Sequence, residues 1–200
     1  MFCACFRPGV APCLSCVRQG GAEEGRGQLT VEAGGRACVS DMKELEPDTF
    51  FRRVIVEAGP GDNMPARKNK LVAPDKMRKV VLCSGQIFYD LYHARAARKV
   101  DDVLLVRIEQ LAPFPFDRIA SVLSKYPKAR WCWAQQEPKN MGAWSFVLPR
   151  LKTAVKKLVP EAADKELEYA GRSVSASPAT GLFRVHQEEA RLILDEVFDS

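Results

Sequence analysis

The sequence predicts an α/β fold: a three-layer α/β/α sandwich with a mostly parallel sheet. Three observations support it. From about residue 78 onward, short apolar runs alternate with segments of helical periodicity. The apolar runs are unbroken, as in strands that are covered on both faces. The connections are short, which favours successive β-α units with right-handed crossovers.

The first expected unit is a strand at Val80–Cys83 with the helix that follows it. The strand ends at the turn residues Ser84-Gly85. The helix repeats apolar residues on one face, at Ile87, Leu91 and Ala94. Its last turns carry cations, which suit the negative end of the helix dipole, at Arg95, Arg98 and Lys99.

Two further units follow. Val103–Ile108 predicts the second strand, and a helix begins after Pro113 and Pro115, with Phe116, Ile119, Leu123 and Tyr126 along it. Ala129–Gln135 predicts the third strand. The next helical face consists of Leu148, Leu151, Val155 and Leu158. Pro149 interrupts this face and should start a helix or kink one.

The last elements are a short strand at Glu166–Ala170, a loop at Gly171–Gly181 and a final helix. The buried side of that helix is expected to carry Ala190, Leu194 and Val197. An aromatic cluster around the third strand is typical of core or interface rather than of base stacking. It consists of Trp131, Trp133, Trp144 and Phe146.

The domain organisation predicted from these patterns has three parts. Residues 1–40 are rich in Gly and Cys without periodicity, so we expect a disordered or artefactual extension. Residues 41–77 form a lead-in segment and polar linker, and 78–200 form the α/β domain. Early cysteines could offer zinc ligands, at Cys3, Cys5, Cys13 and Cys16, but their spacing is not that of a usual finger. Cys83 and Cys132 lie in apolar runs and are expected to be buried.

Charge and hydropathy disfavour several classes of partner. The 30 basic and 25 acidic residues are mixed along the chain, which does not predict nucleic-acid binding. The densest basic stretch, Arg67–Lys79, lies in a polar segment and is interpreted as a solvated linker. No apolar run is long enough to predict a membrane span. The N-terminus makes a poor transit or signal peptide.

Sheets of this kind often bind ligands at the carboxyl ends of their strands, which makes those ends the first candidates for chemistry. Ser84-Gly85 opens a helix and could cradle a phosphate, although a plain turn is the favoured interpretation. Glu109 and Glu137 could form a carboxylate pair if their strands are neighbours, but ion pairing or capping is favoured. Neither His93 nor His186 has a partner at the spacing of a triad or metal pair.

Several long strings in the sequence are more specific than its composition. They are KVVLCSGQIFYDL (79–91), RIEQLAPFPFD (107–117), QQEPKNMGAW (135–144), the Pro149-Arg150-Leu151 triplet and YAGRSVSASPATG (169–181). In these strings the chain resembles the C-terminal region of the 2-oxoglutarate dehydrogenase decarboxylating component. The likeness covers about residues 41–200. NMGAWSFVLPRL is also similar to the 2-oxoadipate dehydrogenase paralogue, so both substrates stay open.

The resemblance implies a transketolase C-terminal-like domain of an oxidoreductase of the tricarboxylic acid cycle, located in the mitochondrial matrix. The family enzyme uses thiamine diphosphate and Mg to decarboxylate 2-oxoglutarate, then passes a succinyl group to lipoyl. This chain has no cofactor motif, since Gly61-Asp62 lacks the required context. We therefore expect no catalytic, cofactor or metal residues, and no activity from the chain alone.

The resemblance also implies partners. These are the catalytic domains of the same enzyme, its dimer mate, the succinyltransferase and the lipoamide dehydrogenase. The chain would then be a scaffold and dimerisation domain, with an exposed apolar face that includes some of Phe114, Phe116, Trp144 and Phe146. One departure is Gln136, where the family usually has a glutamate.

The alternative is a free-standing regulatory module that binds acetyl-CoA or AMP. Arg172, which matches an arginine in the family's YAGR-like segment, is the one candidate for an effector contact. Its guanidinium could bind a phosphate with two hydrogen bonds. Pairing of Arg172 with a carboxylate at an interface is an equally weighted interpretation.

Overall fold

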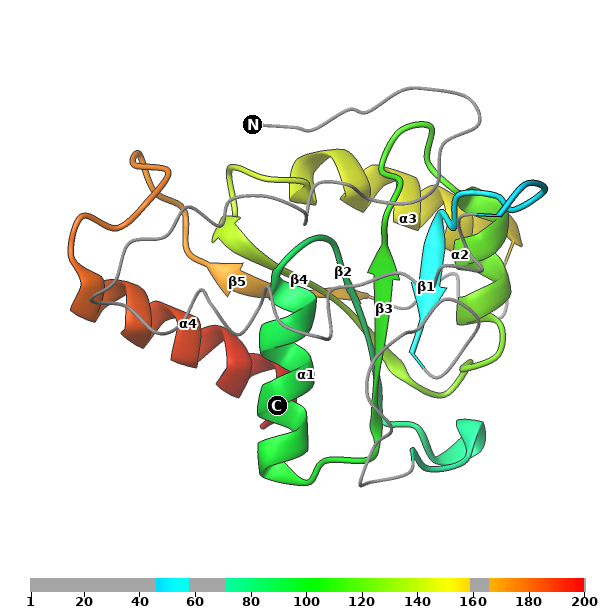
Figure 1. Ribbon diagram of the computed structural model, residues 1–200, viewed down its shortest axis with the longest axis horizontal. Helices are drawn as coiled ribbons and strands as arrows, with labels where there is room; N and C mark the ends of the chain where they lie inside the picture. Colours follow the sequence, from blue (N-terminus) through cyan, green and yellow to red (C-terminus); the bar gives the residue numbers. More distant parts are fainter. Residues whose placement is uncertain (1–45, 58–70, 159–165, 200) are drawn as a thin grey trace.

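The computed structural model of the chain describes residues 46–57, 71–158 and 166–199 (Figure 1). These residues form one sheet of five strands in the order β1-β3-β2-β4-β5. The strands are β1 Val54–Val56, β2 Lys79–Cys83, β3 Val103–Ile108, β4 Arg130–Pro138 and β5 Leu167–Arg172. The helices are α1 Ile87–Arg98, α2 Phe116–Leu123, α3 Trp144–Leu158, α4 Phe183–Phe198 and the short 3-10 helix η3 Pro74–Lys76.

Two layers of helices cover the sheet, which confirms the predicted three-layer fold. The core between the sheet and α2 with α3 includes Leu82, Ile119 and Leu151. The core on the other face, beneath α1 and α4, includes Leu91 and Val197. Figure 1 shows these helix pairs on opposite sides of the strands.

The central strand β2 is buried along its whole length. Its parallel neighbours are β3, with Val81 opposite Leu105, and β4, with Val81 opposite Cys132. Successive residues of a strand point to opposite faces, so Leu82 enters one core and Val81 the other. Burial on both faces is the reason that the strand consists of an unbroken apolar run.

The first strand, β1, comes from the segment that the sequence presented as a lead-in. It pairs with β3 in antiparallel orientation, Val54 opposite Ile108, and forms one edge of the sheet. Directly after it, Glu57 is buried and forms an ion pair with Arg95 of α1. The lead-in segment thus contributes both an edge strand and a buried charge to the domain.

One expectation about a charged residue needs correction, and one of the two roles expected of Pro149 is excluded. Lys79, the last residue of the basic stretch interpreted as a solvated linker, is fully buried and forms an ion pair with Glu168 at 3.3 Å. Lys79 is buried because β2 begins there, between two neighbouring strands. Pro149 does not start a helix, because α3 begins at Trp144 and continues through the proline.

Of the four aromatic residues from which the exposed apolar face was expected to draw some members, Phe116 is exposed and two are buried. Phe114 and Trp144 are buried in the core, and Phe146 is half-buried. Phe116 is exposed, with its ring edge-to-face on Phe114 at 5.0 Å between centroids. The aromatic cluster around the third strand is confirmed as core, because Trp131 and Trp133 are also almost fully buried.

The buried side predicted for α4 holds only in its C-terminal half. Val197 is buried there and Leu194 is half-buried, but Ala190 is exposed. The preceding residue, Glu189, pairs with Arg172, the last residue of β5.

Predictions on residues 1–40 and on Cys3, Cys5, Cys13 and Cys16 fall outside the described residues. Within the part of the chain that is described, no helix is long and apolar enough to cross a membrane.

Candidate functional site

The motif strings converge on one edge of the sheet. Parallel strands end at the same edge, so the residues after β2, β3, β4 and β5 become neighbours there. The edge is built from the turn after Cys83, the Arg107–Glu109 segment, the β4 end with its loop to Trp144, and Arg172. We refer to these residues as the carboxyl edge.

The side-chain amide of Gln135 organises the loop after β4. Its Oε1 accepts hydrogen bonds from the Trp133 indole and from the backbone N–H of Trp144, both at 3.0 Å. Its Nε2 donates to backbone carbonyls within 3.2 Å, those of Glu137, Pro138 and Met141. Both ends of this buried amide are therefore fully used to hold the start of α3 against β4.

Two glycines of the motif strings are required by close packing around this amide. Gly142 has a φ of +67°, and a Cβ there would lie 3.0 Å from the Glu137 Cβ. A Cβ at Gly171 would lie 2.5 Å from the Tyr169 hydroxyl. A side chain at either position would collide with the loop, so these glycines have a structural role.

Tyr169 of β5 links the loop to the next strand. Its ring packs on Trp144 with centroids 4.9 Å apart. Its hydroxyl lies 3.3 Å from the Glu137 carbonyl and 3.2 Å from the Arg172 carbonyl. Burial raises the pKa of Tyr169 to about 12, so the phenol stays protonated near neutral pH.

Arg172, the predicted effector residue, is engaged within the chain. Its Nε lies 2.5 Å from Glu189 Oε2 of α4, and its Nη1 donates to the Pro178 carbonyl at 3.1 Å. The side chain is 12% exposed. A second link fixes the same loop, because the Asn140 side chain exchanges two hydrogen bonds with the Ser175 backbone. The arginine thus joins the end of β5, the following loop and α4.

Glu109 and Glu137 do not form a pair. Their strands, β3 and β4, lie on opposite sides of β2. Glu109 instead forms an ion pair with Arg107 at 2.7 Å, which confirms the ion-pairing interpretation for this residue. Burial raises the pKa of Glu109, and the neighbouring arginine opposes that shift. Glu137 is exposed.

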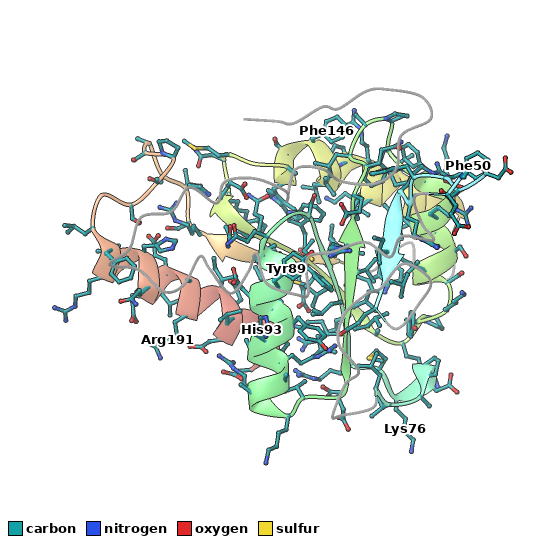
Figure 2. All side chains as sticks on the ribbon, viewed as in Figure 1. Phe50, Lys76, Tyr89, His93, Phe146 and Arg191 are labelled. Atoms are coloured by element: carbon teal, nitrogen blue, oxygen red, sulfur yellow. The ribbon has the colours of Figure 1, made fainter. Side chains whose placement is uncertain are left out.

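Arg107 is held by α1 as well as by Glu109. Its guanidinium carbon lies 4.6 Å from the centre of the Phe88 ring, and its Nη1 donates to the Tyr89 hydroxyl at 2.9 Å. Figure 2 labels Tyr89 in the first turn of α1. These contacts connect the end of β3 to the start of α1.

Asp90 joins the carboxyl edge through Gln136, the residue that departs from the family pattern. The Gln136 amide donates to Asp90 Oδ2 at 2.8 Å. Burial raises the pKa of Asp90, while that hydrogen bond and the charges of His93 and His186 lower it. A glutamate at position 136 would place two carboxyl groups in this contact.

The remaining candidates do not form a catalytic arrangement. Ser84-Gly85 is a strand-to-helix turn in which Gly85 has a φ of +79° and is exposed. His93 and His186 are exposed on α1 and α4. Burial raises the pKa of both Cys83 and Cys132 to about 12, which keeps these thiols protonated. Among the described residues, no group of three or more His, Cys, Asp or Glu could hold a metal ion.

The residues that organise the edge most were not predicted as site residues. Gln135 and Asp90 lie inside motif strings without an expected role, and Glu189 lies outside these strings. A glutamine between buried tryptophans is a detectable feature, because a buried amide must find partners. The contacts of Asp90 and Glu189 come from distant elements and leave no local pattern.

Comparison with known proteins gives consistent matches. The family model described as 2-oxoglutarate dehydrogenase C-terminal matches residues 39–198. The 2-oxoglutarate dehydrogenase E1 component of Brucella anthropi is 40% identical over 164 residues, which cover 80% of this chain and 16% of that protein. The component of Brucella ovis matches at the same identity and coverage. The chain therefore spans only 16% of the length of these relatives.

A solved split-gene transketolase, an inactive beta4 tetramer, is a distant structural neighbour. It matches with a TM-score of 0.41 and 13% identity, covering 62% of this chain and 38% of that chain.

Proposed function

Because the chain belongs to the 2-oxoglutarate dehydrogenase C-terminal family, we propose that it acts as a scaffold and dimerisation domain of a 2-oxoglutarate dehydrogenase E1 component. In this role it packs on the catalytic domains of the enzyme and supplies no catalytic group. The complete enzyme would decarboxylate 2-oxoglutarate in the tricarboxylic acid cycle. It would then pass the succinyl group to the succinyltransferase, with lipoamide dehydrogenase as a further partner.

One observation carries the proposal: the polar side chains of the motif strings are used inside the chain. Gln135 holds the β4 loop, Arg107 pairs with Glu109, and Arg172 pairs with Glu189. Catalytic groups would instead point into a cleft at hydrogen-bond distance from a reacting atom. The polar side chains of the motifs therefore stabilise the carboxyl edge of the sheet.

Thiamine diphosphate and magnesium would bind elsewhere in the complete enzyme. Magnesium prefers carboxylate and other oxygen ligands, and the described residues offer no metal-binding cluster. The mitochondrial location and the choice between 2-oxoglutarate and 2-oxoadipate stay predictions, and the relatives named above are bacterial.

A chimera tests the proposal. Residues 39–198 would replace the matching C-terminal region of the Brucella anthropi E1 component. We expect the chimera to assemble and to decarboxylate 2-oxoglutarate with added thiamine diphosphate and magnesium, and the chain alone to be inactive. Decarboxylation by the chain alone, or a chimera that does not assemble, would overturn the proposal.

The second candidate function is that of a regulatory module, and the observation that favours it is the position of Arg172. This guanidinium lies beside a loop at the carboxyl edge, where ligands bind in many parallel sheets. A phosphate of acetyl-CoA or AMP would have to displace Glu189 from it. Calorimetric titration of the chain with acetyl-CoA and with AMP tests this function. A heat of binding that disappears in the Arg172→Ala variant would support the regulatory module. The absence of a heat of binding at millimolar ligand would exclude it.

A further inference from the structure

A cavity of about 300 Å³ lies on the face of the sheet that α2 and α3 cover. Its apolar lining includes the buried side chains of Leu123 from α2, Trp131 from β4 and Leu151 from α3. Trp131 lies opposite Leu167, the first residue of β5, which also lines the cavity. The cavity is therefore at the amino ends of β4 and β5, away from the carboxyl edge. Figure 1 shows α2 beside the C-terminal part of α3, where the two helices contact each other.

Two lysines of α3 add positive charge to this apolar lining. Lys152 and Lys156 both line the cavity and are both exposed. They are four residues apart, so they lie on the same side of the helix. A lysine can lay its methylene stem along an apolar surface while its ammonium group stays in water. Within the part of the chain that the structure describes, neither ammonium group pairs with a carboxylate.

The surroundings of the cavity are basic as well. The segments 123–131 and 144–158, which supply most of the lining, contain no acidic residue. Their basic residues are Lys125, Lys128, Arg130, Arg150, Lys152, Lys156 and Lys157. Glu168 of β5 is already paired, with Lys79 and with Arg130, at 3.3 Å in each case. Charges of one sign around a cavity with apolar walls attract a ligand of the opposite charge.

We propose that this cavity binds a small amphiphilic anion, a carboxylate with a hydrocarbon body of medium length. The hydrocarbon body lies against Trp131, Leu151 and Leu167, where it is removed from water. The carboxylate lies at the opening, between the ammonium groups of Lys152 and Lys156. A volume of about 300 Å³ is at the lower end of the range for small-molecule sites, which suits a short ligand.

Calorimetric titration of the complete chain with octanoate tests the proposal. Octanol, which lacks the charge, and acetate, which lacks the hydrocarbon body, are the comparison ligands. We expect octanoate to bind at a single site, and each comparison ligand to bind at least about tenfold more weakly. Lys156→Glu should weaken octanoate binding at least about tenfold, because it replaces an attractive charge with a repulsive one.

Lys157→Glu is the matched control. It changes the net charge by the same amount at the neighbouring position of α3, but Lys157 does not line the cavity. Both lysines are exposed, so both variants should keep the melting temperature of the parent chain. Octanoate affinity should be retained in Lys157→Glu and lost in Lys156→Glu.

Three results would overturn the proposal. The first is the absence of saturable binding at millimolar octanoate. The second is an equal affinity of octanoate for the parent chain and both variants, which would place the ligand elsewhere on the molecule. The third is octanol binding as tightly as octanoate, which would show that the lysines do not select an anion. The test uses the chain by itself and does not depend on assembly of the E1 chimera, so its outcome is separate from that of the proposed function.

Discussion

Glu57 and Arg95 form a buried ion pair that joins the segment after β1 to the last turns of α1. Arg95 also donates to the Val103 carbonyl at 2.9 Å, and Glu57 accepts from the Leu105 N–H at 3.2 Å. These hydrogen bonds of the pair cross between elements. This connection makes residues outside the predicted domain boundary part of its core.

Removal of one member of this pair should destabilise the domain strongly. We expect Glu57→Gln to lower the free energy of unfolding by about 3–5 kcal/mol, because Arg95 would keep a buried charge without a carboxylate. Urea denaturation measures the change. The exposed pair Arg53–Asp117 is the control, and Asp117→Asn should cost no more than about 1 kcal/mol. Similar losses in both variants would contradict the role assigned to burial.

Gln135→Leu should separate the role of the buried amide from that of its exposed neighbour. The substitution leaves the Trp133 indole and the Trp144 N–H without their acceptor, so we expect a loss of roughly 2–4 kcal/mol. Gln136→Leu removes one exposed hydrogen bond and should cost about 1 kcal/mol or less. Chemical denaturation of both variants provides the comparison, and equal losses would argue against the amide as the organiser of the loop.

Gly171→Ala tests the close packing beneath Tyr169. The added methyl group would meet the tyrosine ring and force a shift, at a cost of roughly 1–3 kcal/mol. Gly181→Ala, in open space at the end of the same loop, should change stability little. Thermal unfolding monitored by circular dichroism measures both, and an unchanged melting temperature in Gly171→Ala would show that the ring moves freely.

The Asp90→Asn variant should show that the charged Asp90 carboxylate destabilises the domain in a pH-dependent way. Burial raises the folded-state pKa of Asp90 above its ordinary value. The contribution of Asp90 to the free energy of unfolding is therefore most favourable at a pH below the ordinary pKa, and it is lost as the pH rises through the folded-state pKa. The neutral variant should therefore gain stability relative to the parent chain as pH rises from about 3 to 7. Unfolding at several pH values checks this. An advantage that instead grows toward low pH would contradict it.

The sequence by itself determined the layers of this domain. Unbroken apolar runs such as Val80–Cys83 mark strands that are covered on both faces, and helical stripes such as that of α1 follow the 3.6-residue period of the helix. The order of the β-α units then leaves few possible topologies, and these have a mostly parallel sheet. The strand ends at Ser84-Gly85, Glu109 and Gln136-Glu137 were also identified from the sequence, because they follow the apolar runs directly.

Only the tertiary structure decided which charges are buried and which apolar residues are left exposed. Lys79 and Arg95 have the local surroundings of solvated cations, and their carboxylate partners, Glu168 and Glu57, are far away in the sequence. Phe183 lies on the same helical stripe as Val197, but only one of them lies above the sheet. Periodicity gives the side of a helix that is apolar, whereas the ends of the strands beneath it decide how far that side is covered.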